Sequence, residues 1–183
     1  MEVRLARPPR RVAAARVCQG RGVIVWVNGA PEADLASVAA QMRRVEPGLV
    51  VLDPAHLGAL VREALGDGAE GAEQEEERQE VWRSLTVHVA LQLRQLTGRD
   101  VVVPCAVADG ALLAAALHEM REAGEKVRHY FVDAAGAAAR AALPAGTVIL
   151  DAESTSEEDL ARVVLEDRLT RAPRFPAVLR PPR

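Results

Sequence analysis

The stretch that decides the fold is Val23-Ile-Val-Trp-Val-Asn-Gly-Ala30, an apolar run rich in β-branched residues that stops at an Asn-Gly pair. An unbroken apolar run of this length is typical of a strand buried on both faces, as in a parallel sheet. From Leu35 to Val45, apolar residues then recur at helical spacing, and Glu46-Pro47-Gly48 ends the pattern. A strand, a tight turn and a helix therefore follow one another, which is an arrangement that often binds phosphate.

The rest of the chain repeats this alternation. Further strands are predicted at 49–52, 101–104, 127–132 and 147–150. Helices are predicted after Pro54, over 81–96, over 110–123, over 134–143 and from Ser156 onward. This order indicates an α/β fold of three layers, a five-stranded parallel sheet with helices on both faces. Ligands of such folds bind beyond the carboxyl ends of the strands.

Within the predicted helices, apolar residues mark the faces expected to be buried. In the first helix these are Leu35, Val38, Ala39, Met42 and Val45. In the long helix they are Val81, Trp82, Leu85, Val89, Leu93 and Leu96.

Composition and charge divide the chain into regions. The 183 residues, of which 49% are hydrophobic and 27% charged, indicate one globular domain. We place that domain at residues 22–167, with an acidic mobile loop at 66–77. An Arg-rich extension at 1–21 precedes it, and an Arg- and Pro-rich tail at 168–183 follows it.

The turn after the first strand lacks the residues of a phosphate-binding loop. Such a loop, G-x-x-x-x-G-K-[ST], needs free backbone N–H groups, a lysine and a hydroxyl. Aligned on Gly29, the second glycine position is Asp34, the lysine position is Leu35 and the hydroxyl position is Ala36. Lys126 is the one lysine of the chain and precedes the fourth strand. A carboxylate ~4 Å from a phosphate oxygen costs about 4 kcal/mol at an effective dielectric constant near 20.

A structural interpretation of the same turn is that the chain uses it to start a helix. Pro31 suits the first helical position, and Glu32 and Asp34 suit the first turn, where carboxylates offset the helix dipole. Asn28, Gly29 and Ser37 would then be remnants of a nucleotide loop. We favour this interpretation over a working phosphate site.

Several segments together resemble a known family. These are 23–30, Leu52-Asp-Pro-Ala-His-Leu-Gly58, Val81-Trp-Arg83, Val103-Pro104 and Arg128-His-Tyr-Phe131, in this order. The pattern resembles the tunicamycin-resistance family of P-loop ATP-binding proteins, relatives of small nucleotide and antibiotic kinases, over residues 22–167. The resemblance implies an adenylate-kinase-like fold that uses ATP and Mg²⁺.

The chain departs from that family in two places. Members carry a complete phosphate loop, and they carry an arginine-bearing lid between the fourth and fifth strands. Here the lid interval shrinks to residues 133–146, in which Arg140 is the one basic residue and hence the phosphate candidate. Phosphoryl transfer relies on positioning and charge neutralisation, so both departures count against it.

The resemblance also suggests a substrate cleft. Asp53 ends the second strand, where related kinases place a carboxylate that contacts the acceptor. Its structural interpretation, which we favour, is a helix cap before Pro54. His56 and Arg62 are candidates for the same cleft, with solvated surface as the alternative, and Trp82 is a candidate for its wall or for the core.

No metal site and no cofactor are expected. The four histidines show no metal-ligand spacing, and Cys18 and Cys105 read as reduced thiols of a cytoplasmic protein. No apolar segment is long enough to predict a membrane span. Nucleic acid is disfavoured as a partner because the basic ends lack interleaved aromatic residues.

Three hypotheses follow. The first is a non-catalytic, kinase-like binding or interaction module whose nucleotide site is lost or weakened, with a protein or a small molecule as partner. The second is an ATP- and Mg²⁺-dependent phosphotransferase acting on a small, antibiotic-type compound. The third is an electrostatic scaffold that docks on an acidic partner through its Arg-rich ends.

Overall fold

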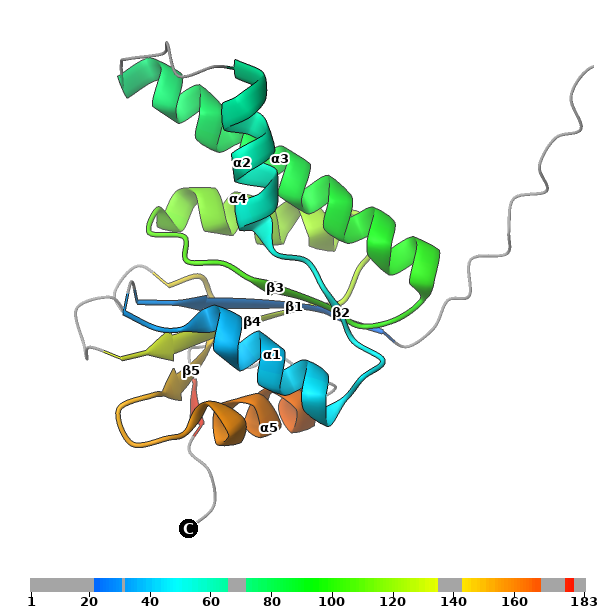
Figure 1. The fold of residues 1–183 in the computed structure, drawn as a ribbon, viewed down its shortest axis with the longest axis vertical. Coiled ribbons are helices and arrows are strands. Elements are labelled where there is room, and N and C mark those ends of the chain that lie inside the picture. The colour runs from blue at the N-terminus through cyan, green and yellow to red at the C-terminus, as the bar shows by residue number, and fades with distance from the viewer. Residues whose placement is uncertain (1–21, 31, 66–71, 135–142, 169–176, 180–183) are drawn as a thin grey trace, which may run out of the picture.

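The protein is built on one parallel sheet, shown in the computed structural model, which describes residues 22–30, 32–65, 72–134, 143–168 and 177–179 (Figure 1). Its strands are β1 (Ile24–Gly29), β2 (Val50–Val51), β3 (Val101–Pro104), β4 (Val127–Asp133), β5 (Val148–Asp151) and β6 (Ala177–Leu179). They lie in the order β2-β3-β1-β4-β5-β6, and every neighbouring pair is parallel. The strands that the sequence predicted are thus confirmed as one parallel sheet.

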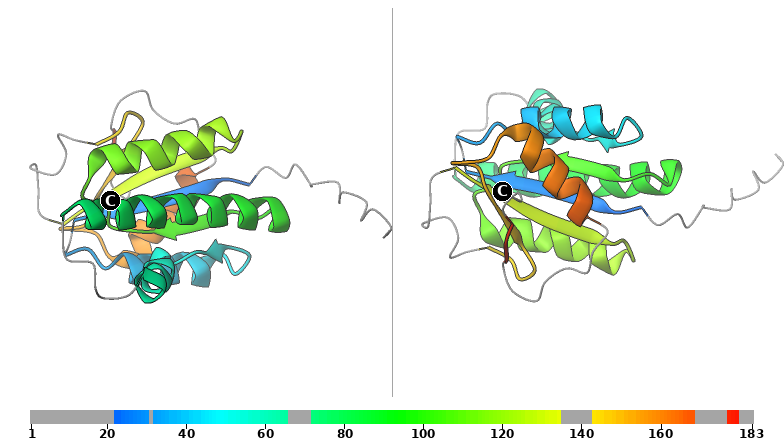
Figure 2. Two further views of the ribbon diagram at one scale, coloured as in Figure 1. Left: turned by 90° about the horizontal axis from the view of Figure 1, so that it is seen from above. Right: turned by 90° about the horizontal axis from the view of Figure 1, so that it is seen from below.

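Helices cover both faces of this sheet. They are α1 (Leu35–Val45), α2 (Pro54–Leu65), α3 (Ala72–Thr97), α4 (Gly110–Glu122) and α5 (Glu157–Asp167). α1 and α5 pack on one face, α3 and α4 pack on the other, and α2 lies against α3 (Figures 1 and 2). The three-layer α/β fold expected from the sequence is confirmed.

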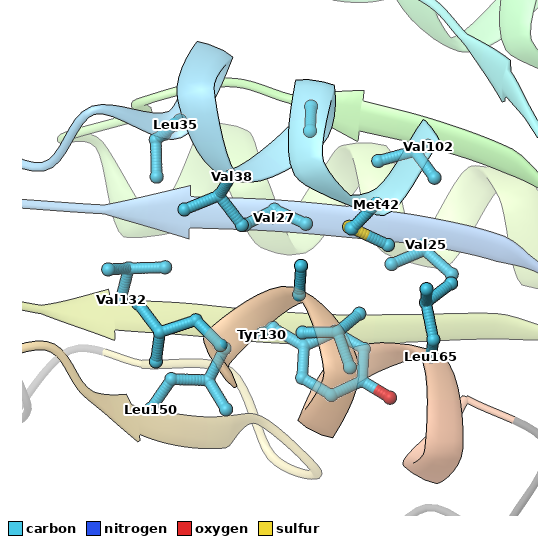
Figure 3. Packing of buried hydrophobic residues seen from close by; sticks show 14 of the residues in the cluster. Val25, Val27, Leu35, Val38, Met42, Val102, Tyr130, Val132, Leu150 and Leu165 are labelled. Carbon is cyan, nitrogen blue, oxygen red and sulfur yellow. The ribbon is translucent and has the colours of Figure 1, made fainter. Parts of the chain in front are cut away.

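The core on the α1 and α5 face follows the alternation along β1. Val25 and Val27 point into it and meet Val38 and Met42 of α1 (Figure 3). Val23, directly before β1, belongs to the same cluster. The other contributors come from β3, β4, β5 and α5, and include Val102, Tyr130, Val132, Leu150, Leu160, Val164 and Leu165. Full burial of each valine or leucine contributes ~1.5–3 kcal/mol, so this layer anchors β1 and its following loop.

The core on the opposite face uses the alternate residues of the same strands. Ile24 and Trp26 of β1 lie in it with Leu113, Leu117 and Met120 of α4. Trp26 is only 1% exposed. Because β1 is buried on both sides, the strand at the centre of the sheet reads as continuously apolar.

The residues of α3 and α1 that are buried differ from those that the apolar spacing predicts. In α3 the fully buried residues are Thr86, Val87, Ala90 and Arg94, whereas Val81 is 49% and Leu96 84% exposed. In α1, Val45 is 51% exposed although the four other predicted residues are buried. Two of the predicted residues of α3, Val89 and Leu93, still pack against the core, so the buried face is shifted from the predicted one and not opposite to it.

Two predicted boundaries also change. α3 begins at Ala72, so residues 72–77 belong to a helix and not to a mobile loop. The remaining loop residues, 66–71, lie outside the described residues. Within the tail, Ala177–Leu179 adds a sixth strand beside β5. The extension at 1–21 and most of the helix predicted over 134–143 are outside the described residues.

Ion pairs link helices and strands at the amino ends of the strands. Arg168, directly after α5, donates from Nε to Asp100 Oδ2 at 2.7 Å and also pairs with Glu46 at the end of α1. The other oxygen of Asp100 accepts the backbone N–H of Val23 at 2.8 Å. One carboxylate thus joins β1, β3 and α5 at the end opposite the expected site.

A second pair lies beside it. Arg128 of β4 is 1% exposed and donates to Asp167, which also accepts the hydroxyl of Tyr130 at 2.8 Å. The guanidinium carbon of Arg128 lies 5.6 Å from the centre of the Tyr130 ring. Buried charges require such partners, because desolvation alone is costly.

None of the described helices combines the length and the apolar character needed to cross a membrane.

Candidate functional site

The loop after β1 turns its backbone N–H groups inward. Asn28 Oδ1 accepts the N–H of Gly29 at 2.9 Å, and the N–H of Ala30 donates to the carbonyl of Val132 at 3.2 Å. The N–H of Ala33 donates to the carbonyl of Ala30 at 2.9 Å. A phosphate loop instead leaves such groups pointing at the ligand. These three amides are therefore engaged within the chain.

The helix after this loop is capped by its own carboxylate. Asp34 Oδ1 accepts the N–H of Ser37 at 2.9 Å, and α1 begins at Leu35. The predicted helix start at Pro31 is thus wrong in its position, and Pro31 itself is outside the described residues. Asp34 is the N-cap and not a first-turn residue, while Glu32 lies in the exposed turn before it. The carboxylate occupies the positive end of the helix dipole.

Leu35 fills the space above the turn. A Cβ atom built on Gly29 would lie 2.8 Å from Leu35 Cδ2 and 3.0 Å from the Cβ of Ala33, so only glycine fits there. Leu35 is 7% exposed and packs into the core with Val38 of the next turn (Figure 3). The position at which a phosphate loop carries lysine thus holds a buried apolar side chain.

One hydrogen bond beside this loop was not predicted from the sequence. The Ser37 hydroxyl donates to Glu157 Oε2, in the first turn of α5. The two residues are 120 positions apart, so no local pattern signals the contact. It adds a third carboxylate to Glu32 and Asp34 near the start of α1.

The described residues do not fit the triphosphate of ATP. Three amides of the loop are engaged, Leu35 covers Gly29, and the hydroxyl of Ser37 is bonded to a carboxylate. Arg140, the predicted phosphate residue, lies outside the described residues. We therefore derive no chemical step through bound ATP or Mg²⁺.

A cavity of about 400 Å³ opens farther along the carboxyl ends of the strands, between α2, α3 and the ends of β2 and β3. Its lining residues are Asp53, Ala55, Gly58, Val61, Arg62, Glu75, Arg78, Gln79, Trp82, Pro104, Cys105 and Ala106. We call it the α2–α3 cavity. Three of the predicted cleft residues, Asp53, Arg62 and Trp82, meet here, whereas His56 does not line it.

Asp53 has a structural role and also faces this cavity. Its Oδ1 accepts the N–H of Ala55 at 2.9 Å, so it caps the start of α2 as the favoured interpretation expected. His56 Nδ1 lies 3.7 Å from Asp53 Oδ2, but the His56 side chain is 85% exposed. Because Asp53 lines the cavity, its carboxylate can also accept a hydrogen bond from a ligand there.

Trp82 forms one wall of the cavity. Its Nε1–H donates to the carbonyl of Pro54 at 2.9 Å, which fixes α3 against the first turn of α2. A Cβ atom on Gly58 would stand 3.4 Å from Trp82 Cδ1, so the glycine leaves the indole edge uncovered. Arg62 lies one turn after Gly58 and brings a guanidinium to the same place, 3.5 Å from that Cβ position.

Charges of both signs surround the cavity. Arg78 is mostly buried and its Nη1 lies 3.9 Å from Glu75 Oε2, on the preceding turn of α3. Arg62 adds a positive charge from α2, and Asp53 a negative charge from the end of β2. The site therefore suits a ligand that carries both an anionic group and a hydrogen-bond donor, together with a flat apolar part against Trp82.

Asn28 positions the segment after β3, which forms another side of the α2–α3 cavity. Its Nδ2 donates to the carbonyl of Val107 at 3.1 Å, and its Oδ1 accepts the N–H of Val107 at 2.8 Å. This pair of bonds holds residues 105–107 against the end of β1. Burial, with a smaller contribution from the charge of Asp53, raises the pKa of the Cys105 thiol to about 12. Asn28, predicted as a loop remnant, thus shapes the α2–α3 cavity.

Within the part of the chain that the structure describes, no three His, Cys, Asp or Glu side chains are arranged to hold a metal ion.

Comparisons with solved structures place these features in a known fold. A mutant of the APS kinase CysC from Mycobacterium tuberculosis superposes with a TM-score of 0.58 at 25% identity, covering 80% of this chain and 96% of that one. The same kinase in complex with AMPPNP and APS gives a TM-score of 0.56 at 20% identity, with 80% and 97% covered. The tunicamycin resistance protein of Deinococcus radiodurans gives 0.53 at 20% identity, with 81% and 78% covered.

The chain has a P-loop kinase-like fold. The tunicamycin resistance protein among these structures has the family name that the sequence resembles, but its 20% identity speaks for the fold alone. No protein-family model matches the sequence, and no curated protein matches it. What the kinase-like fold does in this chain must therefore be argued from its own residues.

Proposed function

We propose that this protein is a non-catalytic, kinase-like binding module. In this proposal its nucleotide site is taken over by its own side chains, and the α2–α3 cavity holds a small molecule. The observation that carries the proposal is Leu35 seated on Gly29, at the place where a phosphate-binding lysine would be needed.

Electrostatics support the same conclusion. Glu32, Asp34 and Glu157 bring carboxylates to the loop after β1, and a triphosphate would meet them without a neighbouring amine. Lys126, the one lysine, precedes β4 at the amino ends of the strands. At an effective dielectric constant near 20, each such contact at ~4 Å opposes binding by about 4 kcal/mol.

Calorimetry with ATP and Mg²⁺ on the full chain tests this proposal. We expect no heat of binding up to millimolar nucleotide and no thermal stabilisation of the folded protein. An affinity in the micromolar range would overturn the proposal. Glu157→Gln is the matched variant: removing this one charge leaves Leu35 and the cap in place, so we expect it to remain unable to bind.

The ligand cavity is tested by retention of a small molecule. Mass spectrometry of molecules released from the purified protein compares the wild type with Gly58→Leu, which fills the space beside Trp82. Leucine favours helix more than glycine does, so the variant is expected to stay folded. A molecule retained by the wild type and lost from Gly58→Leu supports the cavity as its site; equal retention by both variants contradicts it.

A phosphotransferase is the second candidate. It is favoured by the similarity to an APS kinase and by Asp53, which faces the cavity together with Arg62. It requires ATP turnover that Asp53→Asn abolishes while the fold persists. If the wild type hydrolyses or transfers no phosphate, this candidate fails.

The third candidate, an electrostatic scaffold, stays a prediction. Its Arg-rich ends fall almost wholly outside the described residues. Association with an acidic partner would weaken with salt and disappear when both ends are removed. Association that is insensitive to salt would count against it.

A further inference from the structure

A second cavity, of about 460 Å³, lies on the α1 face of the sheet, beside the edge strand β2. We call it the α1 groove. Its floor is apolar and made of small side chains: Ala36, Ala39 and Ala40 on α1, and Val51 on β2. Because three alanines follow one side of the helix, the space between α1 and the edge of the sheet is left unfilled.

The groove has opposite charges at its two ends. α1 runs from the carboxyl ends of the strands toward their amino ends, so Ala36 and Asp53 lie at one end. Arg43 and Arg44, in the last turn of α1, lie at the other end. This polarity defines how a ligand with one charged end would be oriented.

The two arginines have no partner in the described part of the chain. Neither guanidinium forms a hydrogen bond or an ion pair there, and both residues are exposed. By contrast, Arg162 on α5 pairs with Glu158 at 2.9 Å and with Asp159 at 3.1 Å. The helix dipole favours cations in the last turn of α1 but uses none of their N–H groups. Those groups remain available to an anion.

We propose that the α1 groove binds an amphipathic anion, a carboxylate or phosphate carried on a short apolar chain. The anionic group lies between Arg43 and Arg44, where a guanidinium can donate two parallel hydrogen bonds. The apolar chain covers the alanines, and its far end approaches Asp53. This site differs from the α2–α3 cavity, with which it shares Asp53 and Pro104.

The polarity of the groove excludes the reverse orientation. An anion placed at the other end would lie beside the Asp53 carboxylate and away from both cations. A free anion without a chain would bury no apolar surface on Ala36, Ala39 and Ala40. An uncharged chain would leave both guanidinium groups without partners. Each part of the ligand is therefore expected to contribute to affinity.

Titration calorimetry with octanoate and with octyl phosphate, on the full chain, tests the proposal. Acetate and inorganic phosphate supply the anion alone, and octanol supplies the chain alone. We expect saturable, one-site binding of at least one amphiphile. We expect each fragment to bind at least tenfold more weakly. The comparison of octanoate with octyl phosphate identifies which anion the arginines prefer.

Two variants locate the site. The double variant Arg43→Gln/Arg44→Gln removes both cations and is expected to weaken binding by about tenfold or more. Ala40→Leu fills the groove from an exposed helical position, where leucine is well tolerated, and is expected to abolish binding. Circular dichroism verifies that both variants remain folded.

Two controls separate this site from its surroundings. Arg162→Gln changes a cation on α5, and Arg62→Gln changes the α2–α3 cavity; both are expected to leave octanoate affinity unchanged. Binding that survives Ala40→Leu, or that Arg62→Gln removes, would overturn the proposal. So would the absence of binding by both amphiphiles at millimolar concentration. None of these outcomes depends on whether ATP binds, so the proposed function is tested separately.

Discussion

The hydroxyl of Ser37 donates a hydrogen bond to the carboxylate of Glu157 and so joins α1 directly to α5. In a phosphate-binding loop, a hydroxyl at the start of the helix coordinates Mg²⁺. Here the aligned position holds Ala36, and the hydroxyl of the next residue, Ser37, has a protein carboxylate as its partner, which connects the two helices near the loop after β1. The start of α1 thus contributes to the packing of the fold.

Leu35 is expected to behave as a core residue. Leu35→Ala removes apolar contacts above Gly29 and should lower the free energy of unfolding by about 2–3 kcal/mol. Urea unfolding followed by circular dichroism measures the change. Leu96→Ala is the control, because Leu96 is 84% exposed, and its change should stay within about 0.5 kcal/mol. Equal effects of the two substitutions would contradict the packing argument.

His129 should make stability depend on pH. The side chain is 1% exposed, its Nδ1 lies 2.7 Å from Thr147 Oγ1, and burial, with the nearby charge of Arg121, lowers its pKa to about 3. The unfolded chain therefore takes up this proton first, near pH 6.5. The stabilisation is complete above that pH and is lost as pH falls toward 3, by about 1.4 kcal/mol per pH unit.

The comparison with His129→Gln isolates this effect from the titration of carboxylates. Unfolding free energies of the wild type and the variant, measured between pH 4.5 and 7.5, should converge as the pH is lowered. Parallel curves would mean that His129 does not carry the dependence.

Cys105 should react slowly despite lining a cavity. A pKa of about 12 reduces the thiolate fraction at pH 8 about a thousandfold relative to a thiol with the ordinary pKa of 9.0. Greater nucleophilicity of the thiolate offsets part of this loss, so alkylation should be slower by about thirtyfold or more. Iodoacetamide labelling of a Cys18→Ala chain, folded and in urea, measures the ratio.

Asp53→Asn provides the matched comparison for this thiol. Removing the negative charge beside Cys105 should lower its pKa and accelerate labelling, while burial still keeps the rate below that of the unfolded chain. A folded-state rate equal to the unfolded one would show that the thiol is not desolvated.

Asp100 should be a main stabilising residue at the amino ends of the strands. Asp100→Ala leaves the Nε–H of Arg168 and the backbone N–H of Val23 without their acceptor, and we expect a loss of about 3 kcal/mol. Thermal or urea unfolding tests this value. Glu46→Ala, which removes a more exposed partner of the same arginine, should cost about 1 kcal/mol or less.

Local signals predicted much of the architecture. The apolar run of β1 and the starts of α4 and α5 each depend on neighbours in sequence, and the structure has all three, with Asp109 and Ser156 as the caps of the two helices. The loop after β1 was also recognised as acidic and without lysine. Its helix starts later than expected, since Asp34 accepts the N–H of Ser37 and thereby defines the cap.

Long-range contacts escaped prediction for a common reason. The sheet order brings together segments that are distant in sequence, and it pairs Ser37 with Glu157, Asn28 with Val107, and Arg168 with Asp100. The buried face of α3 was missed because Thr86 and Arg94, which are polar, lie on it. Arg94 pairs there with Glu125 and donates to the carbonyl of Gly22, so a charged residue is stable in that position.

The ion pairs of Asp100, Asp167 and Arg168 lie at the amino ends of the strands, away from the α2–α3 cavity and from the loop after β1. Substitutions at the carboxyl ends of the strands leave these ion pairs intact. The residues that would meet a ligand can therefore change without weakening the contacts that hold the amino ends of the sheet together.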